Sequence, residues 1–264
     1  MSFKGKVYAI TGGASGIGLA TAKLIHARGG TVCIADVNPQ SLEAATAYFS
    51  QQQQQQQTST NDVAAPFTVT KLDVRKREEV DAWIAGIVQQ FGRLDGAANI
   101  AGVIGKYHGK LKMGEIEDDD WELIMGVNLT GLMYCMRAEL RVIQDGGSIV
   151  NASSIHGLQA TALHGPYGAS KHGVVALTTS AAKEYGPRNI RVNAIAPGPI
   201  DTPLLQDYLE EVGYKPDAPP KFPTSIPRAG TPEEAAQVVL FLLGPDSTYV
   251  SGSVYKVDGA STES

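Results

Sequence analysis

The sequence predicts a single α/β domain in which helices cover both faces of a parallel β-sheet. Seven short apolar segments alternate with amphipathic stretches along the chain. The apolar segments are continuous and do not alternate with polar residues, which is typical of strands buried on both faces. Such segments separated by helices indicate a doubly wound, Rossmann-like sheet.

The limits of these segments define the expected elements. The predicted strands are Val7–Thr11, Thr31–Asp36, Phe67–Leu72, Leu94–Asn99, Ser148–Ala152, Ile190–Ile195 and Ser253–Val257. The helices are expected to begin near Gly16, Pro39, Lys76, Asp118, Pro166 and Pro232.

Length and composition favour one domain over residues 1–264 and exclude several classes of function. Hydrophobic residues make up 43% of the 264 residues, which is enough for a large core. A net charge of −5 argues against nucleic acid or an anionic membrane as a partner. No uninterrupted apolar run approaches the ~18 residues of a membrane span, and the first residues lack the apolar segment of a secretory signal. We therefore expect a cytoplasmic protein.

Two segments depart from the regular alternation. Gln51–Gln57 is a homopolymeric run after the second predicted helix, and we interpret it as a mobile surface insertion. Residues 197–228 are rich in proline and form a long irregular connection, for which a substrate lid is the first hypothesis.

A glycine-rich turn follows the first predicted strand. Gly12, Gly16 and Gly18 lie where the chain must turn from a strand into a helix, with Ser15 and Ile17 in the same turn. Without side chains, backbone N–H groups and the helix N-terminus can approach a pyrophosphate closely. The turn therefore predicts a dinucleotide site.

Asp36 ends the second predicted strand, eighteen residues after Gly18. A carboxylate there accepts hydrogen bonds from the adenosine ribose hydroxyls and repels a 2′-phosphate. We therefore expect NAD as the cofactor, and Asp36 disfavours NADP.

Tyr167 and Lys171 lie four residues apart at the start of a helical pattern, so they share one helix face. A free tyrosine has a pKa near 10, and a neighbouring ammonium favours its phenolate. A phenolate poised near the working pH suits a general base that acts on an alcohol. Ser154, just after a strand end, is placed to orient the substrate oxygen.

These motifs together resemble the short-chain dehydrogenase/reductase family of the roughly 250-residue, single-domain type. The resemblance rests on TGGASGIG at 11–18, LDV around Asp73, NIAG at 99–102, Asn128 in GVNLTG, Ser154, YGASK at 167–171 and IRVNAIAPGPIDTP at 190–203. It covers nearly the whole chain.

The resemblance implies a role for each matching residue. Tyr167 would be the general acid/base, Lys171 would lower its pKa and bind the nicotinamide ribose, Ser154 would hold the substrate oxygen, and Asn128 would position a water in a proton relay. Further cofactor contacts are implied for Asp73, Val74, Asn99, Gly102, Pro197, Ile200 and Thr202. The family's usual second asparagine is Ile100 here, a small departure.

The sequence thus predicts an oxidoreductase that transfers a hydride between NAD and a secondary alcohol or ketone. Two alternatives remain open: an NADPH-dependent ketoreductase of a biosynthetic pathway, and a non-catalytic protein that senses the cofactor. His156 and His164 are interpreted as pocket-wall or surface residues. No metal site is expected, and the resemblance implies a homo-oligomer, a tetramer or a dimer.

Overall fold

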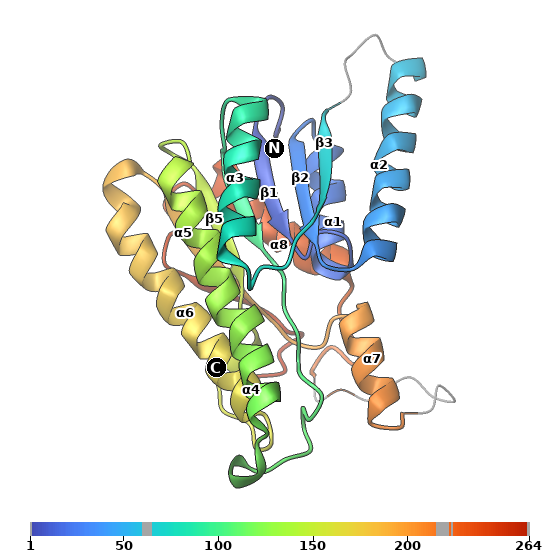
Figure 1. The fold of residues 1–264 in the computed structure, drawn as a ribbon, viewed down its shortest axis with the longest axis vertical. Coiled ribbons are helices and arrows are strands. Elements are labelled where there is room, and N and C mark those ends of the chain that lie inside the picture. The colour runs from blue at the N-terminus through green and yellow to red at the C-terminus, as the bar shows by residue number, and fades with distance from the viewer. Residues whose placement is uncertain (1, 60–64, 215–221, 223, 263–264) are drawn as a thin grey trace.

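The computed structural model describes residues 2–59, 65–214, 222 and 224–262, and it confirms the predicted fold class (Figure 1). A seven-stranded, fully parallel sheet has the order β3-β2-β1-β4-β5-β6-β7. The strands are β1 (Val7–Thr11), β2 (Thr31–Asp36), β3 (Phe67–Lys71), β4 (Gly96–Asn99), β5 (Ser148–Ala152), β6 (Arg191–Pro197) and β7 (Val254–Val257). Their limits differ from the prediction by at most two residues.

Helices cover both faces of this sheet (Figure 1). The α-helices are α1 (Gly16–His26), α2 (Pro39–Ser59), α3 (Arg77–Phe91), α4 (Asp118–Met125), α5 (Leu132–Val142), α6 (Gly165–Tyr185), α7 (Pro203–Glu211) and α8 (Pro232–Leu243). Helices α1, α2 and α8 share one hydrophobic cluster with the sheet, and α3, α5 and α6 share the other. None of the described helices is long and apolar enough to span a membrane.

The alternation of side chains along β2 explains the two clusters. Cys33 and Ala35 face the cluster that contains Trp83 of α3, whereas Ile34 faces the one that contains Phe49 of α2. Successive residues of a strand point to opposite faces, so a strand covered on both sides is apolar throughout. This is the reason for the continuous apolar segments in the sequence.

The sheet changes its direction of growth between β1 and β4. The chain builds outward from β1 through β2 to β3 and then returns to add β4 on the other side of β1. In open parallel sheets, ligands bind in the crevice outside the carboxyl ends of the strands at such a switch point. Here that crevice lies beyond Thr11, which pairs with both Ala35 and Asn99.

The two irregular segments contain more helix than we expected. Gln51–Gln57 continues α2, because glutamine is a good helix former and the run lacks Gly and Pro. The side-chain amide of Gln53 donates a hydrogen bond to the Ala65 carbonyl (2.9 Å). The predicted lid includes α7, capped by the Thr202 hydroxyl. Its residues 215–221 and 223 lie outside the described residues.

A buried polar network joins β4, β5 and α5. The Asn99 amide donates to Glu139 Oε2 (3.0 Å) and to Asn151 Oδ1 (3.1 Å). Glu139 is fully buried, and burial raises its pKa to about 8, an effect partly opposed by the hydrogen bond from Asn99. The folded protein therefore holds this carboxyl group in its neutral form across the acid range.

We expect Glu139 to make the protein less stable at alkaline pH. A folded-state pKa above the unfolded value gives a stabilising contribution that is lost as the pH rises from about 4.5 to about 8. The neutral variant Glu139→Gln should match the wild type in unfolding free energy near pH 5 and exceed it near pH 9, on the order of a few kcal/mol. Urea denaturation at both pH values measures this. The exposed Glu43→Gln is the control, and equal pH dependence in Glu139→Gln and wild type would contradict the assignment.

Candidate functional site

The glycine-rich turn between β1 and α1 is held tightly against its neighbours. A Cβ on Gly12 would lie 2.8 Å from Ala101 Cα, and one on Gly16 would lie 3.0 Å from Thr202 Cγ2. Both residues have positive φ, +61° and +48°, a conformation that glycine adopts without steric cost. A Cβ on Gly18 would collide with the Gly12 carbonyl oxygen. The turn therefore packs directly against Gly18 and leaves no space for a side chain at this position.

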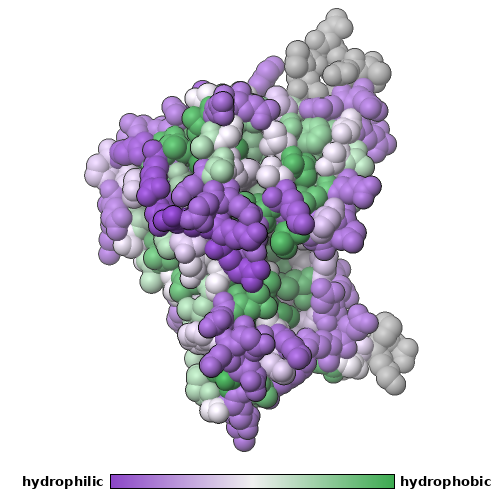
Figure 2. All heavy atoms as spheres, in the orientation of Figure 1, coloured by the Kyte–Doolittle hydropathy of each residue, from purple (hydrophilic) through white to green (hydrophobic). Residues whose placement is uncertain are grey.

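A cleft of about 300 Å³ opens in front of this turn at the switch point. Figure 2 shows hydrophobic side chains in the hollow between the body of the sheet and the α7 region. The predicted cofactor residues that line this cleft are Gly12, Ser15, Gly16, Ile17, Asp36, Asp73, Val74, Gly102 and Thr202. The structure therefore brings most of these residues to one crevice beside a helix N-terminus.

Asp36 lies at the β2 end of the cleft, where backbone amides fix its carboxylate. Oδ1 accepts hydrogen bonds from the N–H groups of Val37 (2.8 Å) and Asn38 (3.1 Å), and Oδ2 accepts one from Ala14 (3.1 Å). These bonds hold a negative charge at the edge of the cleft.

Asp73 follows β3 and is bound by Arg75 on the same rim. The Arg75 guanidinium donates to both carboxylate oxygens, at 2.7–3.1 Å. Hydrogen bonding to Arg75 is the main reason that the pKa of Asp73 lies below its usual range. The positive charge of Arg75 is thus already paired.

A second cleft of about 540 Å³ adjoins the first and contains Ser154, Tyr167 and Lys171. Ser154 begins the 3-10 turn Ile155–Gly157 (η3) after β5, and the other two lie on the first turns of α6. Ser154 interacts with the Tyr167 side chain in the direction that favours the phenolate. Lys171 Nζ lies 5.6 Å from the centre of the Tyr167 ring and donates to the Ala152 carbonyl (2.8 Å).

Burial is the main cause of the pKa shifts of both Tyr167 and Lys171. Burial raises the pKa of Tyr167, and the hydrogen bond with Ser154 only partly lowers it. Burial also lowers the pKa of Lys171 to about 8. We expect the Lys171 ammonium, together with the positive charge of a bound oxidised nicotinamide, to oppose this effect of burial and to depress the pKa of Tyr167.

Asn128 lies behind this group in a π-helical turn, Gly126–Gly131 (η2), and is fully buried. Its side-chain amide exchanges two hydrogen bonds with the backbone of Val103, each 2.8 Å, and donates to Ser170 Oγ (3.2 Å). A Cβ on Gly102 would lie 3.3 Å from Asn128 Oδ1 and 3.4 Å from Lys171 Nζ. The two polar atoms therefore face the same small space at Gly102.

The remaining predicted residues fall into two groups. Pro197, Ile200 and Thr202 line the second cleft, as the motif after β6 implied. Asn99 is a correction: its side chain does not line either cleft but turns into the core toward Glu139 and Asn151. The strand pleat directs it inward, since the next position, Ile100, faces the cleft.

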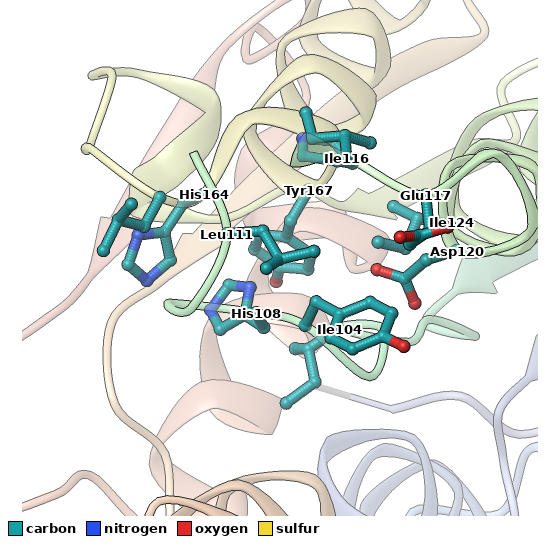
Figure 3. A pocket seen from close by; sticks show the side chains of 12 residues that line it. Ile104, His108, Leu111, Ile116, Glu117, Asp120, Ile124, His164 and Tyr167 are labelled. Carbon is teal, nitrogen blue, oxygen red and sulfur yellow. The ribbon is translucent and has the colours of Figure 1, made fainter. Parts of the chain in front are cut away.

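Residues that we had not assigned to the site also line the second cleft. His108 comes from the loop between β4 and α4, and Tyr208 from α7. A narrow pocket beside Tyr167 is lined by this loop and by α4 (Figure 3), where Asp120 Oδ1 accepts a hydrogen bond from the Lys106 N–H (2.7 Å). His108 lies on a loop, where no periodic pattern marks a residue that faces a cleft. Tyr208 falls within the predicted lid, 197–228, but its position on a helix that faces the cleft was not predicted.

Comparisons with known proteins agree with this geometry. The family model described as enoyl-(acyl carrier protein) reductase matches residues 12–262. Over 256 residues, the chain is 59% identical to the short-chain dehydrogenase/reductase ABA4 of Pyricularia oryzae, which covers 97% of this chain and 91% of the relative. It is 37% identical to a 2,5-dichloro-2,5-cyclohexadiene-1,4-diol dehydrogenase of Sphingobium indicum, over 98% of this chain and 97% of the relative. The crystal structure of levodione reductase superposes with a TM-score of 0.86 at 34% identity, covering 97% of each chain.

We expect Gly18→Ala to disrupt the turn. The added Cβ meets the Gly12 carbonyl, so the backbone must shift. The variant should lose at least about tenfold in NADH affinity, and its melting temperature should fall, since overpacking costs on the order of 1–3 kcal/mol. Nicotinamide fluorescence and thermal denaturation measure the two effects.

Gly86→Ala is the matched control, because a Cβ there meets nothing within 4 Å. It lies in α3, where alanine is favoured by roughly 1 kcal/mol, so this variant should be slightly more stable than the wild type. NADH affinity in Gly18→Ala equal to that of Gly86→Ala would contradict the role of the turn.

Proposed function

Since this chain belongs to the short-chain dehydrogenase/reductase family, we propose that it is an NAD-dependent dehydrogenase that oxidises a secondary alcohol to a ketone, with Tyr167 as general acid/base. One observation carries the proposal. Tyr167, Ser154 and Lys171 converge in a cleft that adjoins a dinucleotide-type cleft at the switch point of the sheet. A protein that only sensed the cofactor would have no need of this convergence.

The geometry assigns a task to each side chain. Ser154 and Tyr167 line the same cleft and interact with one another, so a substrate oxygen seated beside them can bond to both. Tyr167 then takes the hydroxyl proton during oxidation and returns it during reduction. A bound nicotinamide would accept the hydride, which is the hydrogen of the carbinol carbon together with two electrons. In its charged form Lys171 favours the phenolate of Tyr167 and opposes the effect of burial.

Asn128 and Gly102 support a proton route behind Lys171. The Asn128 oxygen retains a lone pair beyond the bond from Val103, and it faces the same space as Lys171 Nζ. A water held there would connect the lysine to the interior of η2. We propose this relay as the path by which Tyr167 regains its protonation state.

The lining of the cleft and one relative favour a ring alcohol as substrate. Ile104, Ile155, Leu204 and Leu205 give the cleft an apolar wall. The name of the Sphingobium relative specifies a diol on a six-membered carbocyclic ring. We therefore propose a secondary alcohol on a six-membered ring, for which cyclohexanol is the simplest test substrate.

Self-association also stays a prediction. Trp121 and Leu123 of α4 are 40% and 36% exposed, and α4 packs beside α6. Exposed large apolar side chains on α4 support a subunit interface at this helix.

Asp36 should make the protein selective for NADH over NADPH. Two negative charges about 4 Å apart repel by roughly 4 kcal/mol at an effective dielectric of about 20. Allowing for screening, we expect NADPH to bind at least on the order of 100-fold more weakly than NADH. Asp36→Ser should reduce this ratio, and Asp207→Asn on α7 should leave it unchanged. Titration of nicotinamide fluorescence measures each constant, and tighter binding of NADPH by the wild type would overturn the cofactor assignment.

Tyr167→Phe should abolish turnover and leave NADH binding intact. Only the proton-transferring oxygen is removed, so kcat for cyclohexanol should fall at least about 1,000-fold while the NADH dissociation constant stays within about twofold. Initial rates and fluorescence titration measure the two quantities. The control is Tyr249→Phe, whose side chain is fully exposed. Residual activity above about one-tenth of the wild type would rule out Tyr167 as the proton donor and acceptor.

A further inference from the structure

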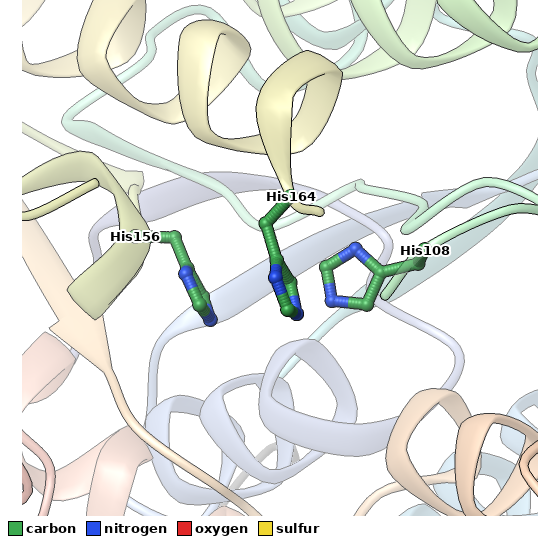
Figure 4. A group of neighbouring side chains, drawn as sticks. All are labelled: His108, His156 and His164. Atoms are coloured by element: carbon green, nitrogen blue, oxygen red, sulfur yellow. The ribbon is translucent and has the colours of Figure 1, made fainter. Parts of the chain in front are cut away.

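Three histidines gather in the substrate cleft and have no part in the proposed proton transfer (Figure 4). His108 comes from the loop after β4, His156 from η3, and His164 from the residue before α6. The ring centres of His108 and His164 are 4.2 Å apart, and those of His156 and His164 are 4.7 Å apart. His108 also lies against Tyr167, with ring centres 5.1 Å apart.

Two of these imidazoles are neutral at physiological pH. Burial lowers the pKa of His108 to about 3 and that of His156 to about 4, and the neighbouring imidazoles add to the effect. A neutral imidazole carries one N–H donor and one lone pair. His108 and His156 therefore present hydrogen-bonding groups and carry no positive charge.

Their hydrogen-bonding capacity is largely unused. Nδ1 of His156 is buried and has no hydrogen-bond partner among the described residues. Nδ1 of His164 lies 2.6 Å from the Ala162 carbonyl, which only accepts, so this nitrogen carries a proton, and in the neutral ring Nε2 is an acceptor. A buried polar atom without a partner costs free energy unless a ligand or water satisfies it.

The surrounding backbone holds the cluster in place. Leu163, immediately before His164, has a φ of +67°, which is uncommon for a residue with a branched side chain. Its carbonyl accepts a hydrogen bond from the Gly109 N–H (3.1 Å), which joins the His108 loop to the start of α6. Strained backbone that neighbouring structure holds in place is typical of ligand sites.

The ring orientations argue against a shared metal ion. Candidate ligand atoms of the three residues all lie within 4.8 Å of one another. However, the planes of His156 and His164 are stacked at 9°. An imidazole binds a metal through the lone pair in its ring plane, and two stacked parallel rings cannot both direct that lone pair at one ion.

We propose that His108, His156 and His164 form a subsite that binds a second hydroxyl group of the ring substrate. The subsite rests on the proposed function, because the reacting hydroxyl is taken to lie at Ser154 and Tyr167. A hydroxyl both donates and accepts, so it can donate to Nε2 of His164 while accepting an N–H of His156 or His108. A carboxylate cannot donate to Nε2 of a neutral His164, so with that ring neutral the subsite favours a diol over a hydroxy acid.

The test compares cyclohexanol with the cyclohexane-1,2-, 1,3- and 1,4-diols and with 4-hydroxycyclohexanecarboxylate. We expect wild-type kcat/KM to be about tenfold higher for at least one diol than for cyclohexanol, the effect of one or two added hydrogen bonds. His156→Phe keeps a ring but removes both nitrogens, and it should bring this ratio close to one. His156→Asn, whose amide can replace Nδ1, should restore part of the preference.

His172→Phe is the matched control, because His172 is exposed on α6 and is not among the residues that line the cleft. It should keep the wild-type ratio. Calorimetric binding of the same alcohols to the enzyme–NADH complex gives a readout that does not depend on turnover, and retained NADH binding shows that each variant is folded.

These measurements separate the subsite from the proposed function. If diols bind more tightly than cyclohexanol through His156 but nothing is oxidised, the subsite stands and the dehydrogenase proposal fails. If diols and cyclohexanol are oxidised equally well, and His156→Phe affects both alike, the dehydrogenase proposal stands and the subsite is overturned. A preference for the carboxylate over every diol also overturns it.

Discussion

Parallel pairing of β1 with both β2 and β4 is the constraint on which the candidate site depends. Parallel strands end on the same edge of the sheet, so the residues that follow them meet there although they are far apart in sequence. Asp36, Asp73 and Ser154 each lie at or just after the end of a strand. Any connection that reversed one strand would move its residue to the opposite edge.

Close approach of backbone to backbone at the switch point shapes the cofactor cleft. Gly12 lies against Ala101, and Gly18 lies against Gly12, with no space for a Cβ at either position. The N-terminus of α1, which lines the cleft, carries partial positive charge. The cleft therefore suits a phosphate group even though it contains no unpaired cation among its described lining residues, since Arg75 is bound to Asp73.

The substrate cleft combines apolar walls with polar groups removed from water. Lys171 is almost fully buried, and its ammonium is held by the Ala152 carbonyl. The low dielectric raises the pKa of Tyr167 and lowers that of Lys171, so it favours the neutral form of each. It also strengthens the hydrogen bonds that a substrate makes in the cleft. In the histidine cluster, the neutral imidazoles of His108 and His156 select a ligand by the direction of hydrogen bonds and not by charge.

The sequence by itself determined the fold class, the limits of most strands and the positions of the glycine-rich turn, Ser154, Tyr167 and Lys171. These depend on local patterns: the apolar run of a buried strand, the spacing of glycines at a turn, and the four-residue spacing on a helix. It gave Asn99 as a cofactor contact and did not show that the side chain points into the core. It also treated the glutamine run as an insertion after α2, whereas the run continues that helix. Only the tertiary structure decided that Asn99 turns toward the buried Glu139, that burial opposes the effect of Lys171 on Tyr167, and that His108 meets His156 and His164. The physical reason is that desolvation and contacts between distant loops depend on what surrounds a side chain in space, and neighbours along the chain carry no record of those surroundings.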